Sequence, residues 1–291
     1  MINFLSRRRK KKEEELLFLL MGSSSYNLTF TASGNGNLTP QITFTGTASV
    51  FVDGVETALT STVAGNIAVT TGQTIGYVFS DYDSITSFSI SSDPVSGDIS
   101  GWTLPASLVY FAVSSTSVSG DISGWTLPAS LENFYVNSTS VSGDISGWTL
   151  PALLAYFYVF STSVSGDISG WTLPASLVDF RVYSTSVSGD ISGWTLPSSL
   201  KTFYVYSTSV SYASASGAFT GITTALTKID FDNCSLSAQH VTNALVDCDT
   251  ANVTDTATIE IAGNNTAPLA AGLTAQSNLE GRGYTVTVTA P

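Results

Sequence analysis

The sequence predicts a mainly β protein in which short parallel strands stack into a solenoid. Three observations lead to this prediction. The eleven letters VSGDISGWTLP begin at Val95 and recur four more times, each copy starting 23 residues after the previous one. Before each copy, apolar residues alternate with variable ones, as in a strand with one buried face. Charged residues make up only 11 % of the chain, and Thr, Ser and Gly are abundant. A repeat of this period is one structural unit that buries its apolar face against its neighbours.

The apolar residues of each unit keep a fixed frame. In the second unit the frame is Leu108, Phe111, Val113, Thr116, Val118, Gly120 and Ile122. This pattern resembles the leucine-rich repeat L-x-x-L-x-L-x-x-N/C-x-L, followed by the G-x-I of plant-type members of that family. The resemblance covers seven units over residues 85–236. It implies a leucine-rich-repeat solenoid of parallel strands, with a strand at about Tyr110–Ser114 in the second unit.

One position departs from that family. Leucine-rich repeats usually place Asn where five units here have Thr and another has Asp93, while Cys234 in the last unit fits the pattern. Thr supplies one hydroxyl donor in place of the two amide donors of Asn, which predicts a weaker hydrogen-bond ladder. The SGDISGWTLP segments have no helical period, so we expect extended or turn-like structure there. The five Trp residues, one in each copy, are expected to pack in the core.

Different patterns flank the repeats. Residues 23–84 show short Thr/Val/Phe/Ile runs broken by Gly and Asn, which predicts a small N-terminal β-sandwich. Residues 237–291 alternate helical and strand patterns, which predicts an α/β C-terminal cap that continues the parallel sheet. Residues 1–22 combine a basic block, three Glu and a six-residue apolar run that is too short to span a bilayer. This segment is either an attachment or oligomerisation plug or a disordered leader.

The charge distribution excludes one class of partner. After residue 22 the chain has four basic and nineteen acidic residues, a balance of −15. A surface of this sign repels a phosphate backbone, so we expect no nucleic-acid partner.

Variation between the units is confined to one surface. The residues between the inward Phe and Val change from unit to unit, and strand alternation places them on the outer, concave face of the sheet. Many of them are Tyr, which offers a large contact area and a hydroxyl group. Exposed aromatic groups mark binding surfaces, although aromatic residues also favour strands. The predicted ligand-binding residues are Tyr110, Asn133, Tyr135, Asn137, Tyr156, Tyr158, Phe160, Asp179, Arg181, Tyr183, Tyr204 and Tyr206.

Other candidate sites have weaker support. The aspartates of the SGDIS segments either accept hydrogen bonds from turn N–H groups or share Ca²⁺, and we favour the first interpretation. Cys234 and Cys248 are either two buried thiols or one disulfide. His240 lies near no recognisable nucleophile or metal-binding pattern, so we expect a non-enzymatic protein with no cofactor. Paired acids among Asp179, Asp230 and Asp232 are the remaining option for hydrolysis. The aspartates of the first group are Asp98, Asp121, Asp144, Asp167 and Asp190.

These features together predict a recognition protein that binds a cell-surface glycan or protein. Near-identical units with a diversified face resemble phage tail-fibre or receptor-binding proteins and bacterial surface adhesins. The N-terminal segment is not a convincing signal peptide and six N-x-S/T sequons are present, which favours a virion surface or another extracellular setting reached from a prokaryotic or viral source. The alternative is a structural subunit of a filament or coat, in which the solenoid mediates self-assembly.

Overall fold

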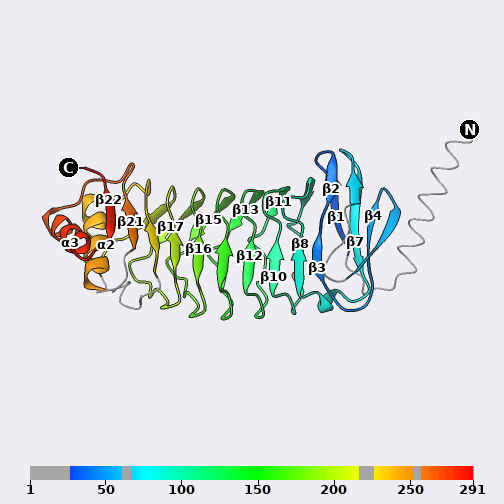
Figure 1. Cartoon of the computed structure of the whole chain (residues 1–291), viewed down its shortest axis with the longest axis horizontal. Coiled ribbons are helices and arrows are strands. Elements are labelled where there is room, and N and C mark those ends of the chain that lie inside the picture. Colours follow the sequence, from blue (N-terminus) through cyan, green and yellow to red (C-terminus); the bar gives the residue numbers. More distant parts are fainter. Residues whose placement is uncertain (1–26, 61–66, 216–225, 252–256, 291) are drawn as a thin grey trace, which may run out of the picture.

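The computed structural model describes residues 27–60, 67–215, 226–251 and 257–290. Within these ranges the chain is mainly β. Two ten-stranded sheets run along the molecule, and the repeats supply parallel strands to both. Figure 1 shows the coils stacked in one row along the long axis, with the N-terminal strands at one end and the helices at the other. The predicted segment 1–22 lies outside the described residues.

Seven units each supply one strand to the first sheet. The inward Phe or Ile of each strand pairs in register with its equivalent in the next, as Phe111 does with Phe134 and Phe203 with Ile229. The strands are β8 (Ser87–Ser89), β10 (Tyr110–Ala112), β12 (Asn133–Tyr135), β14 (Tyr156–Tyr158), β16 (Asp179–Arg181), β18 (Thr202–Tyr204) and β20 (Lys228–Asp230).

The strand predicted at Tyr110–Ser114 is shorter in the structure, because β10 ends at Ala112. Ser115 has a φ of 57°, and the equivalent Ser of each neighbouring coil has the same left-handed conformation, which turns the chain. After this turn the SVSGD letters form a second parallel sheet, which agrees with the predicted extended structure. Its strands are β9 (Val95–Asp98), β11 (Ser117–Asp121), β13 (Ser140–Asp144), β15 (Ser163–Asp167), β17 (Ser186–Asp190) and β19 (Ser209–Ser211).

The core between the sheets is a stack of aromatic rings. Phe111 and Phe134 stack with ring centroids 5.8 Å apart, and the same contact recurs along the row. Trp148 meets Phe134 edge to face at 5.8 Å and is buried. Its indole N–H donates to the carbonyl of Ser123 in the preceding coil, at 3.4 Å. The prediction that the Trp residues pack in the core is confirmed for Trp125, Trp148, Trp171 and Trp194, and Trp102 is partly buried against it.

The Thr of each repeat, at the position where leucine-rich repeats usually have Asn, forms hydrogen bonds within its own coil. The hydroxyl of Thr139 donates to the carbonyl of Val136 at 2.6 Å and accepts from the N–H of Val141 at 3.4 Å. These bonds shape the turn between the two strands and do not reach the next coil. In the last unit Cys234 does reach across, because its thiol donates to the carbonyl of Val205 at 3.2 Å.

A ladder of Ser hydroxyls joins neighbouring coils instead. The Ser130 hydroxyl lies 2.9 Å from the carbonyl oxygen of Ala106 and 2.7 Å from that of Leu108, both in the preceding coil. Ser107, Ser176 and Ser199 make the same pair of contacts. The equivalent position in the fourth unit is Leu153, which has no hydroxyl.

The N-terminal strands are antiparallel and extend both sheets. β1 (Asn27–Ala32) pairs with β9, and β7 (Thr74–Phe79), β4 (Ala48–Val52) and β5 (Val55–Leu59) continue that sheet. β3 (Gln41–Thr43) pairs with β8 and so covers the other sheet. β2 (Gly36–Leu38) pairs with β6 (Ile67–Val69), and a short 3-10 helix, η1 (Tyr82–Ser84), leads into the first coil.

The C-terminal part continues the first sheet with two further parallel strands, as predicted. β21 (Thr258–Ile261) pairs with β20, and β22 (Thr285–Val288) pairs with β21. The connections are α2 (Ala238–Thr250) and α3 (Ala270–Gly281), which pack together. Neither helix is long and apolar enough to cross a membrane, and the described ranges contain no other helix that could do so. Cys234 and Cys248 are buried free thiols.

Candidate recognition surface

The predicted binding residues form three columns on the outer face of the first sheet. We call this surface the tyrosine face. Strand register sets the columns, because Tyr110 pairs with Asn133 and Ala112 with Tyr135 in adjacent coils. The third column continues into the turns and holds Asn137, Phe160, Tyr183 and Tyr206. All eight aromatic residues of the face are half-buried, and most of them pack against an aromatic ring of a neighbouring coil.

The aromatic rings contact one another in two arrangements. In the turn column the ring of Tyr183 stacks on Phe160 at 4.3 Å and on Tyr206 at 4.2 Å, with the planes within 14° of parallel. In the middle column Tyr135 meets Tyr158 edge to face at 4.9 Å and lies 5.4 Å from Tyr110. These contacts hold the rings in fixed positions. The face is therefore organised before any partner binds.

One ion pair interrupts the middle column. The Arg181 guanidinium donates to both carboxylate oxygens of Asp179, and its carbon lies 4.6 Å from the ring centre of Tyr158 and 5.2 Å from that of Tyr204. The Tyr158 hydroxyl donates to the same carboxylate at 2.7 Å. Burial and this hydrogen bond raise the pKa of Tyr158 well above its usual range. The hydroxyl thus remains a neutral donor at physiological pH.

The structure brings most of the predicted residues into contact with one another. Asn133 donates to the Tyr135 hydroxyl at 3.1 Å, which joins the first two columns. Asp179 differs from the prediction of an exposed side chain: it is only 7 % exposed, because Arg181 and Tyr158 cover it. Its role is to hold these neighbours in place rather than to contact a partner directly.

A group of carboxylates lies at the C-terminal end of the tyrosine face. Ligand atoms of Asp230, Asp232 and Glu260 lie within 4.8 Å of one another, close enough to share one cation. The ammonium group of Lys228 lies 2.7 Å from Glu260 and 3.5 Å from Asp230. Burial raises the pKa of Asp230 to about 6, and the neighbouring carboxylates add to this effect. Asp179, the third acid considered for hydrolysis, lies two strands away in the sheet.

The aspartates of the repeated letters stabilise turns. Asp144 accepts the backbone N–H of Ser146 at 2.8 Å, and each of its four counterparts accepts the equivalent N–H. Hydrogen bonds from the hydroxyl and the N–H of Ser146 lower the pKa of Asp144. This geometry supports the interpretation of the column as turn-capping groups.

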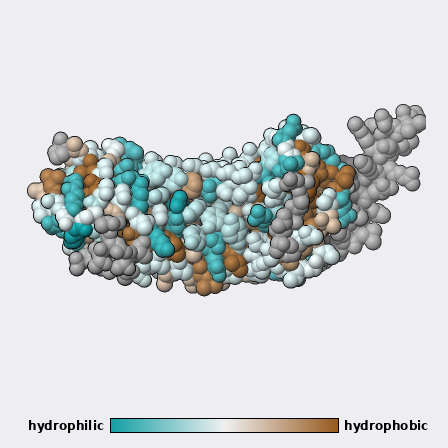
Figure 2. Space-filling view, in the orientation of Figure 1, coloured by the Kyte–Doolittle hydropathy of each residue, from teal (hydrophilic) through white to brown (hydrophobic). Residues whose placement is uncertain are grey.

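Sequence reasoning missed one exposed residue beside the tyrosine face. Leu153 is 52 % exposed, and it is the one large hydrophobic side chain so exposed among the described residues of the seven coils. It lies three residues before Tyr156, at the start of the fourth coil. Figure 2 shows a hydrophobic patch on the lower edge near the middle of the row, beside a mostly pale front surface. The signal was visible in the sequence, where PALL replaces the PASL of other units.

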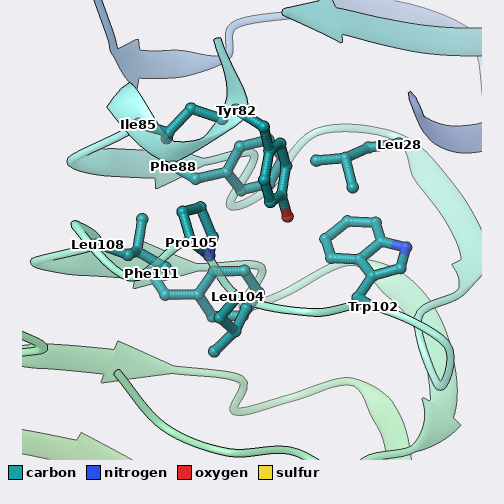
Figure 3. A pocket seen from close by; sticks show the side chains of 9 residues that line it. All are labelled: Leu28, Tyr82, Ile85, Phe88, Trp102, Leu104, Pro105, Leu108 and Phe111. Carbon is teal, nitrogen blue, oxygen red and sulfur yellow. The ribbon is translucent and has the colours of Figure 1, made fainter. Parts of the chain in front are cut away.

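A small cavity lies where the N-terminal strands meet the first coils. Figure 3 shows Trp102 and Leu28 on one side and Phe88, Leu108 and Phe111 on the other. The lining side chains include two polar groups, the indole N–H of Trp102 and the Tyr82 hydroxyl, which donates to the backbone carbonyl of Thr103 at 2.8 Å. Binding sites for small molecules combine apolar walls with a few convergent polar groups. The walls of this cavity are mainly apolar and its Tyr82 hydroxyl is already bonded within the chain, so we regard it as a packing gap.

Comparison with known proteins found no match, either to a protein-family model or to the sequence of a curated protein.

Proposed function

We propose that this chain is a non-enzymatic recognition protein that binds a cell-surface glycan or protein through the tyrosine face. The observation that carries the proposal is the contrast between scaffold and surface. Phe134, Phe157 and Phe180 occupy one inward position in successive coils, whereas the outward residues just before them, Asn133, Tyr156 and Asp179, change. Packing between the coils accounts for the constant inward residues and does not require the outward ones to change. A surface that varies on a constant scaffold is typical of a protein selected for its partners.

The finer features of the fold and setting belong to the same proposal. We assign the coils to a leucine-rich-repeat solenoid, supported by the Phe/Val frame and the 23-residue period. The antiparallel pairs of β1 with β7 and of β3 with β8 support a small β-sandwich as the N-terminal cap. We place the protein at a virion surface, as a component of a phage tail fibre that attaches through residues 1–22. This setting is supported by the basic block and apolar run within residues 1–22 and by the near-identical units with a diversified face.

A binding experiment tests the proposal. The labelled full chain is applied to a panel of intact bacteria and their isolated surface glycans, beside a variant with Tyr135, Tyr158, Tyr183 and Tyr204 changed to Ser. Its matched control changes Ser119, Ser142, Ser165 and Ser188 to Ala on the other sheet. We expect binding by the wild type and the control and none by the Tyr variant, with all three folded by circular dichroism.

Two outcomes would contradict the proposal. Equal binding by the Tyr variant would place recognition elsewhere on the molecule. Absence of binding by the wild type, combined with large assemblies in sedimentation, would instead favour the structural subunit of a filament or coat.

A further inference from the structure

We infer that the partner of the tyrosine face is a folded protein and that the contact centres on Leu153, Tyr156 and Phe160 of the fourth coil. This inference rests on the proposed function and narrows it to one class of partner. Three observations carry it: the orientation of the rings, the break in the Ser ladder and the charge of the face.

The ring faces are largely occupied within the chain. Tyr183 is stacked on both sides, by Phe160 and by Tyr206. Tyr204 has the Arg181 guanidinium carbon 5.2 Å and the Lys228 ammonium 5.2 Å from its ring centre. A sugar packs its C–H groups on an open aromatic face, and Tyr183, stacked on both faces, leaves its edge and hydroxyl for a partner. Edges and hydroxyls suit the mixed polar and apolar surface of a protein.

Leu153 replaces the Ser of the ladder in the fourth coil. The strand of this coil, β14, has the most apolar outward residues of the seven. Four other coils use Ser here to contact two carbonyl oxygens of the preceding coil, and Leu153 offers no donor to Ala129 and Leu131. The substitution also exposes a large side chain to water. It thus opposes stability, and selection for contact with a partner explains its presence.

The fourth coil is the central one of seven, and its three outward positions are all aromatic: Tyr156, Tyr158 and Phe160. Leu153 extends this apolar line past the start of the strand. Protein interfaces are centred on such aromatic and aliphatic anchors, surrounded by polar groups. Asn137 on one side and Arg181 on the other supply polar neighbours.

Charge separates the partner from a second copy of this chain. Beyond the balanced Asp179–Arg181 pair, the C-terminal end of the face has three carboxylates against the single ammonium of Lys228. Two copies that place these acidic ends against each other are repelled. The partner chemistry that fits is a protein surface with an apolar side chain opposite the fourth coil and a Lys or Arg opposite β20, three strand spacings or about 14 Å away.

The experiment uses the bacterial cells that bind the full chain. The cells are treated with proteinase K, which removes surface proteins, or with periodate, which oxidises glycans. We expect proteinase K to abolish binding and periodate to leave it unchanged. Leu153→Ser is expected to weaken binding about tenfold, the effect of losing one central contact. Ser is the residue at four equivalent positions, so this variant keeps the coil architecture.

The matched control is Val55→Ser. Val55 is 68 % exposed at the N-terminal end, and its replacement is expected to leave binding unchanged. Binding lost with periodate but kept after proteinase K would overturn the inference and leave the proposed function standing. Unchanged binding by folded Leu153→Ser would also overturn it, as would a wild-type dimer that this substitution dissociates. Absence of binding to any cell would end both the proposed function and this inference.

Discussion

Arg181 and Asp179 lie two residues apart on one strand and face each other through two parallel hydrogen bonds, Nε to Oδ1 at 2.8 Å and Nη2 to Oδ2 at 2.7 Å. Successive outward residues of a strand rarely pair so closely, because their side chains stand apart. Here the guanidinium carbon also lies within 5.2 Å of the ring centres of Tyr158 and Tyr204, which helps to fix its position. The pair therefore helps to order the tyrosine face.

Removing the cation should destabilise the protein. Arg181→Met leaves the Asp179 carboxylate buried and supported by the Tyr158 hydroxyl alone. We expect a loss of about 1–3 kcal/mol in the free energy of unfolding, measured by urea denaturation. The double variant Arg181→Met, Asp179→Asn should recover part of this loss, because the buried charge is gone. A single variant as stable as the wild type would show that the ion pair contributes nothing.

Restoring the Ser ladder should stabilise the protein. Leu153→Ser places a hydroxyl near the carbonyl oxygens of Ala129 and Leu131 and removes an exposed leucine. We expect a gain of about 1 kcal/mol in the free energy of unfolding. The reverse change, Ser130→Leu, should lower stability by a similar amount. Thermal unfolding of the two variants measures both, and shifts of the same sign would refute the ladder as the cause.

A matched pair of glycines tests the packing between coils. Gly143 has a φ of 122°, and a Cβ there would lie 2.7 Å from the backbone nitrogen of Ser123 and against the Asp121 carboxylate. We expect Gly143→Ala to lower the free energy of unfolding by at least about 2 kcal/mol. A Cβ on Gly147 meets nothing within 4 Å. Gly147→Ala should be close to neutral, and equal effects of the two substitutions would argue against this contact.

The turn-capping aspartates predict an acid limb in the stability profile. Hydrogen bonds lower the pKa of Asp98, Asp121, Asp144 and Asp167 in the folded chain. Their stabilisation is therefore complete above the unfolded-state pKa and is lost as pH falls through the folded-state values. Changing all four to Asn keeps an acceptor oxygen and removes the titration. Urea denaturation between pH 5 and pH 2 should show a shallower decline for this variant than for the wild type.

Asp230 provides a control of opposite sign. Its pKa is raised to about 6, so its contribution to stability is present below the unfolded-state pKa and is lost as pH rises through 6. Asp230→Asn should therefore gain stability relative to the wild type on going from pH 4 to pH 7. An identical pH dependence of wild type and variant would contradict the assignment.

The parts of the fold that follow from local pattern could be predicted from the sequence. Alternation places Phe111 and Val113 inside and Tyr110 outside, and the fixed period then aligns these positions between coils. The helices at 238–250 and 270–281 follow from their own spacing. The second sheet is less visible, because SVSGD contains Gly and Asp and depends on pairing with neighbouring coils.

The details of the site depend on packing that the sequence does not encode locally. Glu260 lies 30 residues after Asp230 in the chain. The two carboxylates come together only because β21 pairs with β20. Asp179 is buried because the Tyr158 hydroxyl and the Arg181 guanidinium cover it, which depends on the rotamers of these side chains. Leu153 could have been found by comparing units outside the strand, since Ser107, Ser130, Ser176 and Ser199 occupy this position in four other units.

The Ser ladder and the Phe stack also determine how the molecule can change in length. The contacts between one coil and the next are nearly the same at every junction along the row. Removing residues 118–140 would bring the Phe111 coil against the Phe157 coil across an equivalent junction. Each such excision shortens the molecule by one strand spacing, about 4.8 Å. Near-identical coding segments exchange by slippage in whole units, so this architecture admits heritable changes of length that leave its ends and its core intact.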